Sequence, residues 1–159
     1  DEGVYQLLRE STYPGMKVLQ FAFDGDYNNP HKPSNSGENY FCYTGTHDNM
    51  PFRGYLEELD YNKLNTLKND VRIQCERFGV DFRADTIRDL VLTIDTLCYA
   101  SPCKGAVIPL QDLLATGKDT RLNLPSSLSD KNWTYRCSKT DFNDSLRNFI
   151  HRNIVRYHR

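Results

Sequence analysis

Two short runs of almost continuous apolar residues constrain the fold of this chain more than any other feature. Residues 16–23 read MKVLQFAF and residues 104–110 read KGAVIPL. Strands covered on both faces have this composition, whereas a strand with one face in water alternates apolar and polar residues. Buried strands of this kind occur in parallel sheets flanked by helices, so the two runs predict an α/β protein. Residues 40–43 predict a further, shorter strand.

Helical patterns occupy the segments between and beyond the predicted strands. The clearest helix is predicted at 86–99, where six apolar residues recur at helical spacing and form one stripe (Ile87, Leu90, Val91, Ile94, Leu97 and Cys98). Looser patterns predict helices at 3–10, 54–67 and 141–157. Helical crossovers imply that the strands run parallel. Three such strands fit either a small α/β sheet or the last part of a closed barrel of eight strands and about 250 residues.

A long irregular stretch separates the first two predicted strands. Residues 24–39 are rich in Asn, Pro, Ser and Gly. Loops of this length inside a compact domain are usually functional or disordered. We therefore expect this segment to be either a functional loop or a disordered one.

Composition excludes several classes of protein. Lys and Arg total 20 against 21 Asp and Glu, so we expect no nucleic-acid partner, which a clustered basic surface would indicate. No apolar run approaches the ~18 residues that span a bilayer, so we expect no membrane partner. The first residues do not resemble a signal peptide. The five cysteines contain no Cys-x-x-Cys pair, which favours reduced, buried thiols in a cytoplasmic protein over disulfides or a metal site.

A His-Asp pair is the first candidate for chemistry. His47 and Asp48 directly follow the strand predicted at 40–43, and catalytic side chains of α/β barrels lie at such strand ends. An Asp that caps a helix beside a surface His is the structural alternative. A metal-dependent phosphohydrolase would need further ligands, and the other histidines (His31, His151 and His158) show no ligand spacing. A nucleophilic triad is also conceivable, but no Gly-x-Ser-x-Gly elbow is present.

Five blocks of the sequence stand out in order along the chain: PGMKVLQFAF at 14–23, YTGTHDN at 43–49, IPLQDLL at 108–114, RLNLP at 121–125 and NWTYR at 132–136. Together they closely resemble the amylomaltase family, the disproportionating enzymes of glycoside hydrolase family 77. Five motifs in one order are far more specific than a single His-Asp pair. The resemblance implies that residues 1–159 form one incomplete domain, the C-terminal portion, about three βα units, of a (β/α)8 TIM barrel.

The same resemblance implies an activity. Amylomaltases are 4-α-glucanotransferases, which break an α-1,4-glucosidic bond and pass the glycosyl segment to an acceptor sugar with retention of configuration. The expected partners are a maltodextrin or other α-glucan, an acceptor sugar and the N-terminal part of the barrel. No cofactor or metal is expected. By the resemblance, the nucleophile and the acid/base lie upstream of Asp1, so we expect the isolated chain to be inactive.

Individual roles follow from the matched motifs. Asp48 matches a third carboxylate of the family and is expected to act in catalysis by binding ring hydroxyls of the sugar that is cleaved. His47 is expected to contact the same sugar. Asn49, Gln111 and Asn123 are the other expected substrate-binding residues.

Two further residues carry alternatives. Asp112 either contacts sugar or caps the short helix that starts there. Trp133 either stacks on a sugar ring or, the interpretation we favour, packs the last helix.

Two segments depart from the family pattern. Residues 33–36 read PSNS where the family has Pro-His-Asn-Tyr, and residues 50–52 read MPF where it commonly has Asp-Thr-Thr. These changes leave open how the loop and the rim of the pocket contact sugar. Two alternative functions stay open: a related α-glucan hydrolase or debranching domain, and a non-catalytic glucan-binding chain, which the absence of the other two carboxylates favours.

Overall fold

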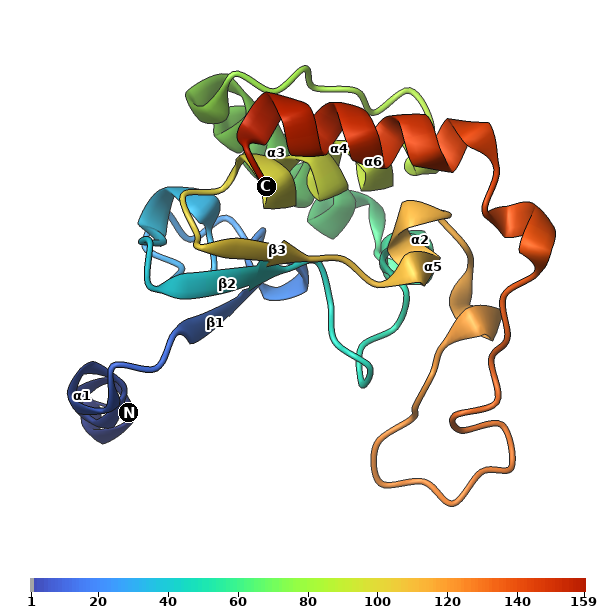
Figure 1. The fold of residues 1–159 in the computed structure, drawn as a ribbon, viewed down its shortest axis with the longest axis horizontal. Helices are drawn as coiled ribbons and strands as arrows, with labels where there is room; N and C mark the ends of the chain where they lie inside the picture. The colour runs from blue at the N-terminus through green and yellow to red at the C-terminus, as the bar shows by residue number, and fades with distance from the viewer. Residues whose placement is uncertain (1) are drawn as a thin grey trace.

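A computed structural model describes residues 2–159 (Figure 1). Its helices and strands are, in chain order, α1 (Glu2–Ser11), β1 (Gly15–Val18), β2 (Tyr40–Tyr43), α2 (Phe52–Glu58), α3 (Tyr61–Phe78), α4 (Ile87–Ala100), β3 (Gly105–Val107), α5 (Leu110–Leu113) and α6 (Asp144–Tyr157). Short 3-10 turns lie between them: η1 (Leu19–Phe21), η2 (Pro33–Asn35), η3 (Lys118–Thr120) and η4 (Lys139–Asp141).

The three strands form a parallel sheet in the order β1-β2-β3. This confirms the predicted parallel α/β class. Helices α3, α4 and α6 lie on one side of the sheet (Figure 1). Cys42 of β2 and five of the six stripe residues of α4 are fully buried in the core between these layers, and the sixth, Ile87, is partly buried against that core.

The opposite face of the sheet is apolar but open. Register pairs Met16 with Phe41, and Tyr43 with both Val18 and Val107, so these side chains share one face. Met16 is 52% and Val107 41% exposed. In Figure 1 no helix of the described chain covers this side, and α1 stands apart from it. The strands therefore have the two apolar faces that their composition predicts, but this chain covers only one of them.

Two predicted strands are shorter in the structure. The strand predicted at 16–23 ends at Val18, and residues 19–21 form the turn η1. Leu19 and Ala22 remain fully buried, so the apolar run continues through a turn that composition cannot distinguish from a strand. The strand predicted at 104–110 covers only residues 105–107, because the chain turns at Pro109 into α5.

Capping residues set the helix boundaries. The helix predicted at 86–99 is confirmed as α4, where Thr86 and Asp89 form a capping box. The single helix predicted at 54–67 is wrong: α2 ends at Glu58, and Asp60 starts α3 by accepting the Lys63 N–H. Helix α6 begins three residues later than predicted, because Asn143 caps its N-terminus.

The stretch 24–39 is an ordered loop packed against α3. Lys32 is buried, and its Nζ lies 2.9 Å from Asp70 Oδ2. Asn29, also buried, donates from Nδ2 to the Phe21 carbonyl at 2.8 Å. The loop contains the turn η2 but otherwise the irregular backbone that its composition predicts.

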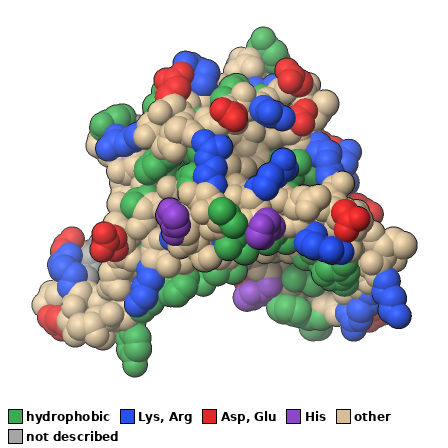
Figure 2. All heavy atoms as spheres, turned by 45° about the horizontal axis from the view of Figure 1, so that its top comes forward, with side chains coloured by type: hydrophobic (Ala, Val, Ile, Leu, Met, Phe, Trp, Pro, Cys, Tyr) green, Lys and Arg blue, Asp and Glu red, His purple; other side chains and the backbone are tan. Residues whose placement is uncertain are grey.

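The burial of four of the five thiols matches the sequence-based expectation, and charges of both signs are mixed on the surface (Figure 2). On the face shown in Figure 2, Lys and Arg side chains are interspersed with Asp and Glu. Cys42 and Cys98 are buried as predicted, together with Cys75 and Cys103, but Cys137 is exposed. Within residues 2–159, no helix is both long and apolar enough to cross a bilayer.

Candidate functional site

A cavity of about 480 Å³ opens at the carboxyl ends of β2 and β3. Because parallel strands run in the same direction, the segments that follow them meet at one edge of the sheet. The lining residues come from the segment after β2, from β3 and α5, and from two more distant positions (Tyr43, Gly45, Thr46, His47, Asn49, Met50 and Pro51; residues 107–112; Met16 and Leu122). The lining is mostly apolar with a few polar groups, as in many ligand sites.

The segment that follows β2 is fixed by Asn49. Its Oδ1 accepts from the N–H and the hydroxyl of Thr46, at 2.9 and 2.7 Å. Its Nδ2 donates to Gln20 Oε1 at 2.7 Å, and Gln20 Nε2 donates to the Met50 carbonyl at 2.9 Å. Asn49 lines the cavity, but its contacts within the chain hold the loop. A sugar contact from Asn49 stays a prediction.

Asp48 lies beside the cavity, between two of its lining residues. Its Oδ1 accepts from Asn123 Nδ2 at 2.6 Å, and its carbonyl accepts from Arg121 Nη2 at 2.6 Å. Nε2 of His47 lies 3.5 Å from the same Oδ1. The carboxylate is 46% exposed, so Oδ2 remains accessible to a ligand. The structure therefore brings together three predicted site residues from two distant segments.

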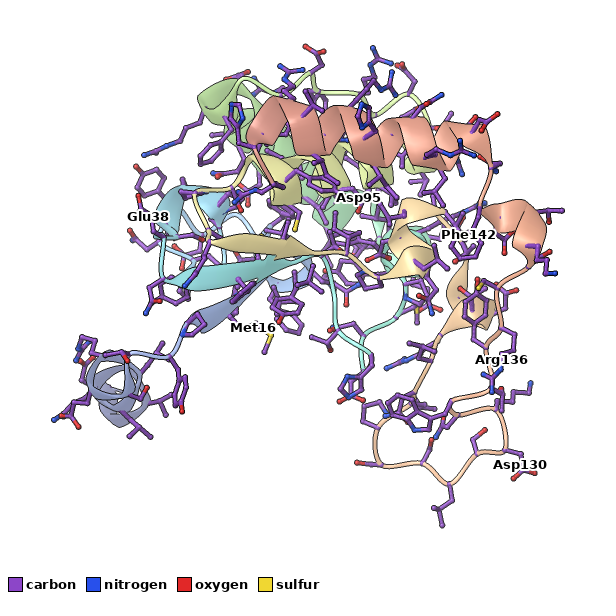
Figure 3. All side chains as sticks on the ribbon, in the orientation of Figure 1. Met16, Glu38, Asp95, Asp130, Arg136 and Phe142 are labelled. Atoms are coloured by element: carbon purple, nitrogen blue, oxygen red, sulfur yellow. The ribbon has the colours of Figure 1, made fainter. Side chains whose placement is uncertain are left out.

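An aromatic pair flanks this carboxylate. The rings of His47 and Trp133 lie 5.3 Å apart at an interplanar angle of 37°. The interpretation that Trp133 packs the last helix is wrong, because its segment extends away from α6, as the positions of Asp130 and Arg136 in Figure 3 show. Trp133 is 56% exposed and has a φ of 64°, a costly conformation for a bulky residue. Its indole is thus presented at the site rather than in the core.

Gln111 and Asp112 occupy the start of α5, and both are buried. Gln111 Nε2 donates to the Thr120 carbonyl at 3.2 Å. Asp112 accepts from the Phe52 N–H and from the Thr44 hydroxyl. Phe52 is the first residue of α2, so Asp112 caps α2. The alternative that it caps its own short helix, α5, is wrong. Burial raises the pKa of Asp112, while these two donors oppose the rise.

Some residues that shape the site carry no clear signal in the sequence. Gln20 is the one polar side chain within an otherwise apolar stretch from Val18 to Phe23, and a buried Gln of this kind usually has a specific partner. Arg121 could have been found only through its place in the RLNLP block. The described residues contain no group of three His, Cys, Asp or Glu side chains arranged to hold a metal.

The combination of groups suits a polyhydroxylated ligand. Asp48 offers a charged acceptor, His47 and Trp133 offer ring faces, and the cavity behind them is largely apolar. Sugars present both hydroxyls and apolar C–H faces, and each of these finds a matching surface here.

Comparison with known proteins identifies the relatives of this chain. The 4-alpha-glucanotransferase family model, glycoside hydrolase family 77, matches residues 1–141. The chloroplastic/amyloplastic 4-alpha-glucanotransferase of Solanum tuberosum is 38% identical over 146 residues, which are 91% of this chain and 23% of that protein. The 4-alpha-glucanotransferase of Clostridium butyricum is 32% identical over 151 residues, 95% of this chain and 29% of that protein.

Solved structures agree. An amylomaltase from Streptococcus agalactiae, in complex with acarbose, superposes with a TM-score of 0.86 at 29% identity, over 100% of this chain and 30% of that one. An amylomaltase from Corynebacterium glutamicum, 16% identical, shares the fold with a TM-score of 0.68 over 99% of this chain and 27% of that one. The chain spans 22% to 29% of the length of the curated relatives. From the family match and these relatives, we conclude that the chain belongs to the 4-alpha-glucanotransferase family.

Proposed function

We propose that this chain is part of a 4-α-glucanotransferase that transfers a segment of an α-1,4-glucan to an acceptor sugar by a retaining, double-displacement mechanism. The observation that carries the proposal is the placement of Asp48. Its carboxylate lies at the carboxyl end of β2, is held by Asn123 through one oxygen, and borders a cavity flanked by His47 and Trp133. Acarbose bound to the Streptococcus agalactiae amylomaltase supports a glucan-like ligand.

The role of Asp48 follows from the charge that develops on the sugar. Retaining glycosidases pass through an oxocarbenium-like transition state in which the ring is distorted. Oδ2 of Asp48 would accept hydrogen bonds from ring hydroxyls, and charge-assisted bonds that tighten during distortion lower the barrier. Asn123 keeps the carboxylate oriented through Oδ1. His47 and Trp133 would present ring faces to the sugar.

Two other carboxylates are needed for the reaction, a nucleophile and an acid/base. None of the matched motifs in these 159 residues supplies them, so we assign them to a part of the barrel outside this chain. In a (β/α)8 barrel the open face of β1, β2 and β3 would line the interior, and β1 and β3 would pair with further strands. Residues 1–159 would then be an incomplete domain whose partner is the rest of the barrel.

The protein would need no metal or organic cofactor for this chemistry, since carboxylic acids perform both proton transfer and nucleophilic attack. We place it in the cytoplasm on its cysteine usage. The names of the plant relatives assign those proteins to plastids. Cell fractionation with an antibody against this chain would test the location.

Incubation with maltotriose tests the activity. The full-length protein that contains this chain should convert maltotriose into glucose and longer maltodextrins without increasing the number of reducing ends. A rise in reducing ends would instead indicate a hydrolase or a debranching enzyme. The isolated chain should give no products, because it holds one of three required carboxylates.

Binding can be measured separately from turnover. Trp133 is the only tryptophan of this chain and lies against His47, so its fluorescence in the isolated chain reports directly on the site. Maltotriose that changes this emission without turnover would mean that the chain alone binds glucan. Unchanged emission together with no transfer by the full-length protein would contradict the proposal.

A further inference from the structure

One buried carboxylate holds both ends of the segment that carries His47 and Asp48. Asp112 Oδ2 accepts from the Thr44 hydroxyl at 2.6 Å, and Oδ1 accepts from the Phe52 N–H at 2.7 Å. Thr44 directly follows β2, and Phe52 is the first residue of α2. Thr44 and Phe52 are fully buried and Asp112 is 2% exposed, so water does not compete for these bonds.

The neighbouring side chain holds the other half of the site. Gln111 Nε2 donates to the carbonyl of Thr120. The residue after Thr120 is Arg121, which bonds the Asp48 carbonyl, and two residues later Asn123 bonds the Asp48 carboxylate. Two adjacent buried side chains of α5 therefore anchor the two loops that meet at Asp48.

The contacts of Asp112 and Gln111 connect the sheet, through α5, to the two loops at the site. Only two residues separate the end of β3 from the start of α5, so the strand closely limits where the helix can lie. Short hydrogen bonds to a carboxylate are roughly twice as strong as neutral ones and are directional. The bonds of Asp112 go to the ends of the loop at 44–52, and within that loop Asn49 adds local bonds.

We propose that Asp112 is a positioning residue for the glucan site: it sets the location of the Asp48 carboxylate relative to the substrate, with Gln111 aligning the second loop. This proposal rests on the proposed function, and it identifies Asp112 as a residue that fixes the position of the Asp48 site. Asp112 would not touch substrate through its carboxylate, because both of its oxygens are already engaged by protein donors.

A matched pair of isosteric variants tests the proposal in the full-length protein. Thr44→Val removes the hydroxyl that Asp112 accepts from. Thr93→Val removes the hydroxyl of another buried threonine, 5% exposed, which donates to the Arg83 carbonyl and not to the site. We expect Thr44→Val to lower kcat for maltotriose transfer by roughly tenfold. Thr93→Val should lower only the melting temperature.

Two substitutions of Asp112 provide the second comparison. Asp112→Ala releases both loop ends, and a displacement of about 1 Å at the site should cost on the order of 10²-fold in kcat with a smaller change in KM. Asp112→Asn should retain activity to within about threefold, because its carboxamide can accept from the Phe52 N–H and donate to the Thr44 oxygen. Rescue by Asn would distinguish positioning from a requirement for the charge.

A readout that needs no activity separates this proposal from the proposed function. Amide hydrogen exchange across residues 45–52 should accelerate in Thr44→Val and Asp112→Ala but not in Thr93→Val. If exchange accelerates in these two variants but the wild-type protein transfers no glucan, the anchoring role would stand and the proposed glucanotransferase activity would be refuted. Unchanged exchange at 45–52, or a kcat loss in Thr44→Val no larger than in Thr93→Val, would overturn the positioning role.

Discussion

The carboxyl group of Asp95 should make the stability of this protein depend steeply on pH. Asp95 lies on α4 (labelled in Figure 3), is 0% exposed, and neither of its oxygens has a hydrogen-bond partner. Burial, and then the charge of nearby Asp112, raise the pKa of Asp95 well above its ordinary value of 3.8. The native state therefore binds this proton more tightly than the unfolded chain does.

The sign and size of the effect follow from that difference. Above the unfolded pKa, unfolding releases the proton, so the free energy of unfolding falls as pH rises until the folded pKa is reached. The fall is about 1.4 kcal/mol per pH unit for one group. In Asp95→Asn the side chain no longer titrates, so this contribution disappears. The free energy of unfolding of Asp95→Asn, relative to that of the wild type, should rise by this amount for each pH unit above about 4.

Urea unfolding at pH 5, 6 and 7 measures the difference directly. The wild type and Asp95→Asn should diverge with rising pH, whereas Thr93→Val, a buried variant without a titrating group, should run parallel to the wild type. Stability curves for Asp95→Asn that stay parallel to the wild type over this range would refute the reasoning. They would mean that the pKa of Asp95 is the same in the folded and unfolded states, so that its titration is not linked to folding.

Three further substitutions test the packing and the site. Gly54→Ala should lower the free energy of unfolding by about 1–3 kcal/mol, because the added Cβ would lie 2.9 Å from backbone atoms of η3. The control Gly37→Ala places its Cβ in open space, with nothing within 4 Å, and should leave the melting temperature unchanged. Asn123→Ala should reduce kcat by roughly tenfold by releasing one oxygen of Asp48, and unchanged kinetics would remove its orienting role. Trp133→Ala should weaken maltotriose binding, measured by calorimetry, by about 1–2 kcal/mol with little change in melting temperature. Unchanged affinity would mean that the indole does not contact the sugar.

Local signals in the sequence were sufficient for some elements. The apolar stripe of α4, started by Thr86 and Asp89, is encoded within a few residues, and the structure confirms it. The apolar runs predict which segments are buried strands but not where they stop. Leu19 lies in a turn but is as buried as it would be in a strand. An apolar run therefore predicts burial but does not distinguish a strand from a buried turn.

Long-range contacts explain what the sequence could not predict. Asp112 meets Phe52 across 60 residues and Thr44 across 68, and no local pattern connects these positions. The resemblance brought Asp48 and Asn123 into one site, and their contact is found across 75 residues. It did not predict that Trp133 would lie against His47, because that contact depends on the path of an irregular segment.

The central claim is that the Asp48 carboxylate stabilises the transition state of glucan transfer, and Asp48→Asn in the full-length protein tests it most directly. The change keeps the size of the side chain and removes its charge. Kinetics on maltotriose should show kcat lowered by about 10²–10⁴-fold, from a loss on the order of 3–5 kcal/mol, with KM changed less. Asp130→Asn, on the exposed part of the 121–137 segment (Figure 3), is the matched control and should behave as the wild type. Turnover by Asp48→Asn close to that of Asp130→Asn would contradict the account.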